Sequence, residues 1–243
     1  MSNLSSRSAI PDQSASSVEG ARNAWSLSRP RLLASLALGA IVIGLVYKGP
    51  PVDEIAGIHL WFGLRGPISG DPWKWIGVGL LLAIVFGVER LGLASLLIRR
   101  PRWVDIEWAL YLFGGAMTWA WLADMIAPQV GNAGIEVVLR LGVLGILVLT
   151  VTAAVTEEIV YRGFLAERLG ALFGARRWAP WVGAGLSLAI FVAPHLAFFG
   201  PSWLLHQFPT ALAIAVIAVV RRNLVIAILV HLLTNLPILF LLF

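Results

Sequence analysis

The chain has 243 residues, of which 59% are hydrophobic, and its mean hydropathy is +0.86. This composition excludes an ordinary water-soluble domain and indicates a membrane protein, in which apolar runs of about 20 residues form spanning helices. The sequence contains no cysteine, which excludes disulfides, thiolate metal ligands and a cysteine nucleophile. A net charge of +5 would suit nucleic acid, but in a membrane protein the basic residues are explained better by orientation.

Residues 1–31 are rich in Ser, Ala and Arg and lack an apolar period, so we expect a mobile cytosolic tail. Residues 32–243 are expected to form a single transmembrane domain, an all-α bundle of about seven spans. The expected spans are 32–47, 73–88, 106–127, 135–157, 178–199, 203–220 and 224–243. Between the second and third spans, residues 89–102 are basic and amphipathic, which predicts a helix on the cytosolic membrane surface.

The basic residues are distributed unevenly among the loops of this arrangement. With the N-terminus inside, 14 of the 18 Lys and Arg lie in cytosolic segments, Arg162 and Arg168 among them. The exceptions are Lys48, Arg65 and Lys74 on the outside and Arg140 within a span. This asymmetry predicts an integral protein of a bacterial inner membrane with its N-terminus in the cytosol and its C-terminus outside. It also removes the case for a nucleic-acid partner.

Two adjacent carboxylates, Glu157 and Glu158, end the fourth apolar run. Ionisable residues at membrane depth are costly, and they usually face a bundle interior or a wet cavity. On a helix Glu158 and Arg162 share a face, whereas Glu157 points about 100° away, with Tyr161 on its own face. The arginine can therefore hold one carboxylate and leave the other available. A simpler interpretation is that these residues only end a helix at the cytosolic headgroups.

Two later spans carry polar groups in apolar surroundings. His195 lies four residues after Phe191 in the fifth span, and His231 and Asn235 share one helix face in the seventh. A lone intramembrane histidine commonly bonds one helix to another, but polar groups from three spans are stabilised best when they share a cavity. We therefore expect these groups and Glu157 to lie within about 10 Å of one another, around a cavity open to the cytosol.

Three motifs resemble, in order and spacing, those of the CAAX-protease and bacteriocin-processing family of intramembrane peptidases, typified by type II CAAX prenyl endopeptidases. The motifs are Glu157-Glu158 with Arg162, Phe191 with His195, and His231 with Asn235. The similarity extends over about residues 90–240, which would form the peptidase core. It implies an endopeptidase that hydrolyses a membrane-associated substrate near the cytosolic side, either a CAAX-type peptide or another membrane peptide. The expected partners are thus a membrane-embedded protein or peptide and the lipid bilayer.

The resemblance also implies a role for each motif. Glu157 would be the general base that activates water, and His195 would orient that water. His231 and Asn235 would donate hydrogen bonds to the oxyanion of the tetrahedral intermediate. The supporting ion pair would be Glu158 and Arg162.

Two alternatives stay open on sequence grounds. In a zinc-dependent version of the same peptidase, Glu157, His195 and His231 would be the metal ligands; we favour the metal-free mechanism, with no cofactor. In the second alternative, a transporter or scaffold, the polar groups would form an ion or proton path across the membrane. Transporters often contain internal repeats, and we find none in this sequence.

Overall fold

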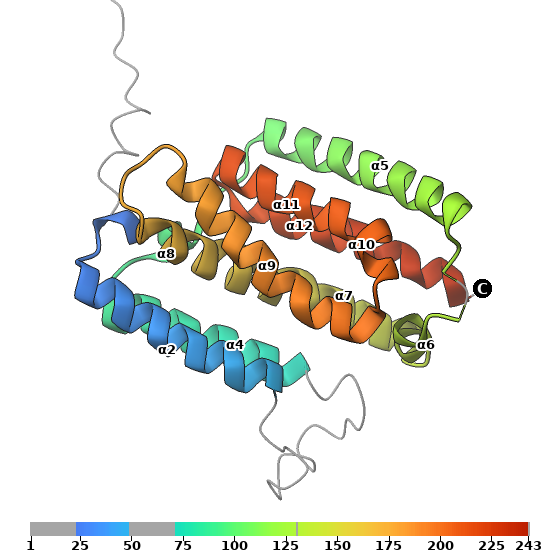
Figure 1. Cartoon of the computed structure of the whole chain (residues 1–243), viewed down its shortest axis with the longest axis horizontal. Coiled ribbons are helices and arrows are strands. Elements are labelled where there is room, and N and C mark those ends of the chain that lie inside the picture. The colour runs from blue at the N-terminus through green and yellow to red at the C-terminus, as the bar shows by residue number, and fades with distance from the viewer. Residues whose placement is uncertain (1–22, 49–70, 130, 243) are drawn as a thin grey trace, which may run out of the picture.

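A computed structural model describes residues 23–48, 71–129 and 131–242, and Figure 1 shows it as a bundle of helices that run in similar directions. Every regular element among the described residues is helical, which confirms the all-α class. The α-helices are α2 (Arg29–Lys48), α4 (Asp71–Ala83), α5 (Trp103–Ile126), α6 (Ala133–Leu139), α7 (Gly142–Glu157), α8 (Ala166–Ala171), α9 (Ala179–Phe199), α10 (Ser202–His206), α11 (Phe208–Arg221) and α12 (Leu224–Asn235). The 3-10 and π segments are η1 (Ala24–Ser26), η4 (Ile84–Glu89), η5 (Leu93–Leu96), η6 (Glu158–Leu165) and η7 (Leu236–Leu242).

Six helical stretches of the described residues are long and apolar enough to cross a membrane, and the chain is an integral membrane protein. They are Arg29–Val46, Pro72–Glu89, Trp103–Ile126, Gly142–Ala171, Ala179–Phe199 and Leu224–Leu242. The remaining predicted span, 203–220, is divided between α10 and α11. With 14 residues, α11 is shorter than the roughly 20 residues that cross a bilayer. The predicted bundle is confirmed, with one of its seven spans short and broken.

The stretch from Gly142 to Ala171 is the central helix of the bundle. In its apolar window 61% of the residues are buried, against 17–33% in the windows of the other five spans. The outer helices present large apolar side chains outward, such as Tyr111 and Ile126 of α5, as a lipid environment requires. The central helix packs against α4 and α12, and its later part also packs against α9. Polar groups of this helix are therefore withdrawn from lipid and water alike.

The central helix begins later than the sequence suggested. The expected start near residue 135 falls in α6, a short helix whose first amide groups, those of Gly134 and Ile135, donate to the side chain of Asn132. Gly142 then has φ +67°, a left-handed conformation that glycine adopts easily and that separates α6 from α7. From this point the chain stays helical past Arg162, so Glu157 lies in the middle of a 30-residue helix.

Close helix packing locks the far end of this helix against α9. A Cβ atom added at Gly183 of α9 would overlap the carbonyl oxygen of Ala166 and the backbone of Gly170. Small residues of this kind let membrane helices approach backbone to backbone. The contact fixes the register of α9 relative to η6, and α9 is the helix that carries Phe191 and His195.

The surface helix predicted for residues 89–102 is wrong. This segment contains only the four-residue η5, and its backbone is interrupted by left-handed conformations at Arg90 (φ 58°) and Leu97 (φ 60°). Leu91, Leu96 and Leu97 are buried in the protein core and do not lie on a membrane surface, whereas Leu93 is exposed. Arg168 of α8, which is fully buried, binds the carboxylate of Glu89 and the carbonyl oxygen of Ser95. The buried guanidinium of Arg168 needs several hydrogen-bond acceptors, and this connection provides them from a backbone that is not helical.

Other boundaries also shift. The predicted mobile tail falls largely on residues 1–22, which lie outside the described residues, but Ala24–Ser26 form η1 and α2 starts at Arg29. Trp25 donates a hydrogen bond to Glu167, so this part of the predicted tail packs on the bundle. Arg162 and Arg168, which were expected in cytosolic segments, are buried in the bundle.

Candidate active site

The double-glutamate stretch is part of an unusual helical segment. Glu158–Leu165 form a π-helix, and all eight of its residues are buried. A π segment inserts extra backbone into a helix and is often found at functional sites. It also turns the residues that follow away from the faces an α-helix would give them. This feature was not predicted, because an apolar period does not distinguish a π turn from an α turn.

Glu157 is the last residue of α7, and its carboxylate is held between two basic groups. Lys74 of α4 donates a hydrogen bond to Oε1 with an Nζ–Oε1 distance of 2.9 Å. The other oxygen, Oε2, lies 3.9 Å from Nε2 of His195. The side chain of Glu157 is 6% exposed, so these neighbours and the bundle, rather than bulk water, set its environment.

Glu158 joins the second histidine to the arginine. Its Oε1 lies 2.8 Å from Nδ1 of His231 and 3.1 Å from NH1 of Arg162. The predicted pairing of Glu158 with Arg162 is thus present, and the contact that His231 makes with the same oxygen was not foreseen. The side chain of Glu158 is fully buried. The other oxygen, Oε2, has no hydrogen-bond partner among the described residues.

Phe191 of α9 packs against most of these groups. Its ring centroid lies 4.2 Å from that of His195 and 6.5 Å from that of His231. The guanidinium carbon of Arg162 lies 4.4 Å from the ring centroid, within the range of a cation–π contact. Tyr161 meets the same ring edge to face at 5.0 Å. The phenylalanine of the second motif is therefore a packing platform for the polar residues of the other two.

The orientation of His195 is set by its own helix. Nδ1 lies 2.7 Å from the carbonyl oxygen of Phe191. A carbonyl only accepts, so Nδ1 carries the hydrogen and Nε2 presents its lone pair in the neutral ring. The ring also stacks near Trp203 of α10, with centroids 5.0 Å apart. Nε2 is thereby aimed at Glu157 and kept there by aromatic packing.

Asn235 ends α12, one turn beyond His231, and its side chain is partly exposed. None of the described residues forms a hydrogen bond with that side chain. The helical period puts it on the same side of α12 as His231. Of the four groups expected to converge, the structure brings Glu157 and both histidines together through Phe191 and Glu158, and it places Asn235 one turn away. The contacts gather the groups at one place instead of distributing them across the membrane.

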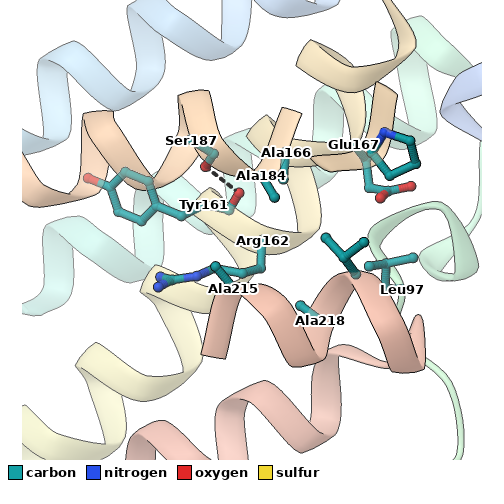
Figure 2. Close-up of a pocket in the computed structure, with 11 residues that line it drawn as sticks. Leu97, Tyr161, Arg162, Ala166, Glu167, Ala184, Ser187, Ala215 and Ala218 are labelled. Carbon is teal, nitrogen blue, oxygen red and sulfur yellow. Dashed lines mark hydrogen bonds between the residues drawn. The ribbon is translucent and has the colours of Figure 1, made fainter. Parts of the chain in front are cut away.

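Two hollows lie close to this cluster, but neither is lined by the two histidines or by Glu157. The first lies between α8, α9 and α11 (Figure 2). In that view the side chains of Tyr161 and Arg162 extend to the side opposite Glu167, and Ser187 donates a hydrogen bond to the carbonyl oxygen of Tyr161. The second hollow is lined by Lys74, Thr156 and apolar residues of α2 and α4.

Lys74 is a site residue that was not predicted. Its position at the start of a span had indicated a place outside the membrane. The available signal was charge balance, since a carboxylate buried at membrane depth requires a partner and Arg162 was already assigned to Glu158.

The segment that carries these residues is similar to a known protein family. Residues 139–237, from the end of α6 to the start of η7, match the family model described as type II CAAX prenyl endopeptidase Rce1-like. All three motifs fall within these residues, so over this segment the chain is similar to the family that its motifs resemble. No curated protein and no solved structure matched the chain.

Proposed function

We propose that this protein is an intramembrane endopeptidase that activates water with Glu157 and stabilises the tetrahedral intermediate with His231 and Asn235. The observation that carries the proposal is the pairing of two buried carboxylates with two histidines. Oε2 of Glu157 faces Nε2 of His195, and Oε1 of Glu158 binds Nδ1 of His231. The substrate is a membrane-associated peptide or protein, as the family match favours.

The facing pair of Glu157 and His195 supports a water site. An ionised carboxylate oxygen and the lone pair of Nε2 are both acceptors, and they stand 3.9 Å apart. A molecule with two donors, such as water, satisfies both at once. Glu157 then takes one proton from this water while the oxygen attacks the carbonyl carbon of the scissile peptide. The same proton passes from Glu157 to the leaving amine as the carbon–nitrogen bond breaks.

His231 and Asn235 supply the charge stabilisation. Nδ1–H of His231 donates to Glu158, because an ionised carboxylate only accepts. In the proposed mechanism the ring of His231 carries a hydrogen on Nε2 as well, and Nε2–H donates to the oxyanion. The amide of Asn235, which no described side chain engages, offers a second donor one turn along the helix. Fixed donors of this kind are worth more in a site from which water is excluded.

The side-chain atoms that would bind zinc in the alternative mechanism can be compared with their present partners. Among the residues that the structure describes, no group of three or more His, Asp or Glu side chains is placed to hold a metal ion. Oε1 of Glu157 is engaged by the ammonium of Lys74, whereas the bond from Nδ1–H of His231 to Glu158 leaves Nε2 of that ring free. An ammonium against one oxygen of a would-be ligand opposes a second cation at the same carboxylate. The ammonium of Lys74 thus disfavours zinc at Glu157, and we propose the metal-free mechanism.

We also propose that the protein lies in a bacterial inner membrane with its N-terminus in the cytosol. The connections after η4, α8 and α11 lie at one end of the bundle, and α6 and the C-terminus lie at the other (Figure 1). The first end carries the exposed Arg99 and Arg100, together with Arg176 and Arg177. Basic residues of short loops remain preferentially in the cytosol.

The test is a comparison of membrane proteomes from cells that carry the wild type or Glu157→Gln as the sole copy of this gene. Labelling of new peptide termini identifies the cleaved proteins, and cleavage is expected to disappear in the variant while the protein still accumulates in the membrane. Glu136→Gln, the same chemical change in α6, is the matched control and is expected to cleave normally. Termini that persist unchanged in Glu157→Gln would refute the assignment of the base.

A further inference from the structure

We propose that Lys74 of α4 is a positioning residue for the catalytic carboxylate, so that the α2–α4 pair completes the active site. Residues 139–237 carry the family match, and Lys74 lies outside them. The inference rests on the proposed function, because it assigns Lys74 a task only if Glu157 is the base.

The geometry of the ion pair fixes the direction of the carboxylate. Lys74 holds Oε1 of Glu157 at 2.9 Å, and the carboxylate then directs Oε2 towards His195. A carboxylate has two equivalent oxygens and rotates about its last bond, so one tethered oxygen defines the direction of the other. The lysine thus selects the oxygen that takes the proton and holds it beside the imidazole.

The charge of the lysine also keeps the carboxylate ionised. The side chain of Glu157 is only 6% exposed, and an ionised carboxylate in such a place needs a partner of opposite charge. Arg162 does not serve, because it is bound to Glu158 and donates to the carbonyl oxygen of Ala211. The ammonium of Lys74 supplies the charge that keeps Glu157 in the ionised form that a general base requires.

The lysine is itself held in place by the packing of its helix. The neighbouring Trp75 donates through Nε1 to the hydroxyl of Thr152 at 3.1 Å, which docks α4 on α7 five residues before Glu157. Behind α4, a Cβ added at Gly77 would lie 2.5 Å from a methyl group of Val46, so α2 packs tightly against it. α4 is therefore held between α2 and α7, and the lysine is presented from a fixed backbone.

A purely structural role is the competing explanation. In that case the ion pair would only attach α4 to α7, and any loosening of this contact would reduce activity in the same way. Trp75 provides the matched control, because Trp75→Phe removes the hydrogen bond to Thr152 and keeps an aromatic ring beside the lysine. Neither Trp75 nor Thr152 belongs to the proposed catalytic groups.

The experiment compares Lys74→Met, Lys74→Arg and Trp75→Phe with the wild type in lipid nanodiscs. The probe is a purified peptide that spans the cleavage site lost in Glu157→Gln. Lys74→Met keeps the aliphatic stem without the charge, and we expect kcat to fall by about 100-fold with little change in KM, since a misplaced catalytic group costs this much. Lys74→Arg is expected to restore most of kcat. Trp75→Phe is expected to lower the melting temperature and leave kcat close to that of the wild type.

A double-mutant cycle measures the pair without relying on activity. Lys74→Met is expected to change the melting temperature of the wild type and to have clearly less effect in a Glu157→Gln background, where the carboxylate charge is already absent. Equal changes in melting temperature in both backgrounds would contradict an interaction between Lys74 and Glu157.

The outcomes distinguish a failure of the proposed function from a failure of the role given to Lys74. If Glu157→Gln cleaves normally, the proposed function fails and the role of Lys74 fails with it. If Glu157→Gln is inactive but Lys74→Met retains its kcat, only the inference about Lys74 is overturned. That inference is also overturned if Trp75→Phe loses kcat as strongly as Lys74→Met, because the lysine would then act only by docking the helix.

Discussion

Nδ1 of His231 lies 2.8 Å from Oε1 of Glu158, and this contact joins the last long helix of the bundle to the π segment at its centre. The same oxygen meets Arg162 at 3.1 Å, so one carboxylate orients both a candidate oxyanion donor and a cation. Glu157, its neighbour in sequence, turns instead towards Lys74 and His195. Adjacent acids thus have separate partners, which supports the proposal that Glu158 is structural and Glu157 is the base.

The first prediction concerns the stability of the two glutamine variants. Glu158→Gln leaves Arg162 as a buried cation without its charged partner, which costs about 3 kcal/mol for pairs of this type. Glu157→Gln affects Lys74 instead, and that side chain is 20% exposed and closer to water. We therefore expect Glu158→Gln to lower the melting temperature in detergent further than Glu157→Gln does, while both abolish cleavage. Equal shifts, or the reverse order, would mean that the roles of the two carboxylates have been exchanged.

The second prediction separates the two nitrogens of His231. The amide nitrogen of an asparagine can replace Nδ1–H as donor to Glu158, but it offers nothing at the position of Nε2. His231→Asn is therefore expected to stay near the wild-type melting temperature and to lose cleavage. His231→Leu removes both nitrogens and leaves Oε1 of Glu158 with one partner fewer, so it is expected to lose stability as well. A stable and active His231→Leu would remove His231 from the mechanism.

The sequence predicted the helices that carry this site better than it predicted the contacts between them. Apolar runs identified the spans, and the four-residue spacing predicted the contact between Glu158 and Arg162, because both signals depend on helix geometry alone. Features that were not predicted include the π-helix, the burial of Leu96 and Leu97, and the contacts of Lys74 with Glu157 and of His231 with Glu158.

The unpredicted features depend on tertiary contacts. The segment 89–102 has the composition of a surface helix, but Arg168 needs the carboxylate of Glu89 and a carbonyl oxygen of the chain, and this tertiary demand overrides local propensity. From the sequence alone Lys74 has the position of an interfacial residue, and only the packing of α4 against α7 places it beside Glu157. Contacts between residues more than 80 positions apart, such as Lys74 with Glu157, leave no periodic trace in one sequence.

The third prediction addresses Asn235. None of the described residues forms a hydrogen bond with its side chain, so Asn235→Ala should change the melting temperature little. If the amide stabilises the oxyanion, kcat should fall by about 100-fold or more, as for a lost oxyanion donor. KM should change less, because the interaction strengthens only as the charge develops. If Asn235 only packs against its neighbours, Asn235→Ala would instead lower the melting temperature and leave kcat unaffected. Leu233→Ala, a truncation on the same helix, serves as the control for loss of side-chain volume.

The last prediction concerns metal dependence. A catalytic zinc needs three protein ligands at about 2 Å and a further group that orients each histidine. Here the ammonium of Lys74 contacts one oxygen of Glu157, and Nδ1 of His231 is engaged by Glu158. The bond from Nδ1–H to Glu158 leaves Nε2 of His231 free, so zinc is opposed by the ammonium of Lys74, which disfavours a second cation at Glu157. We expect the purified protein to carry no stoichiometric zinc, and cleavage of the peptide in nanodiscs to survive a chelator that strips exposed sites. Elemental analysis near one zinc per chain, with activity lost on stripping and restored by zinc, would make Glu157, His195 and His231 ligands and would replace the water-activating glutamate with metal-bound water.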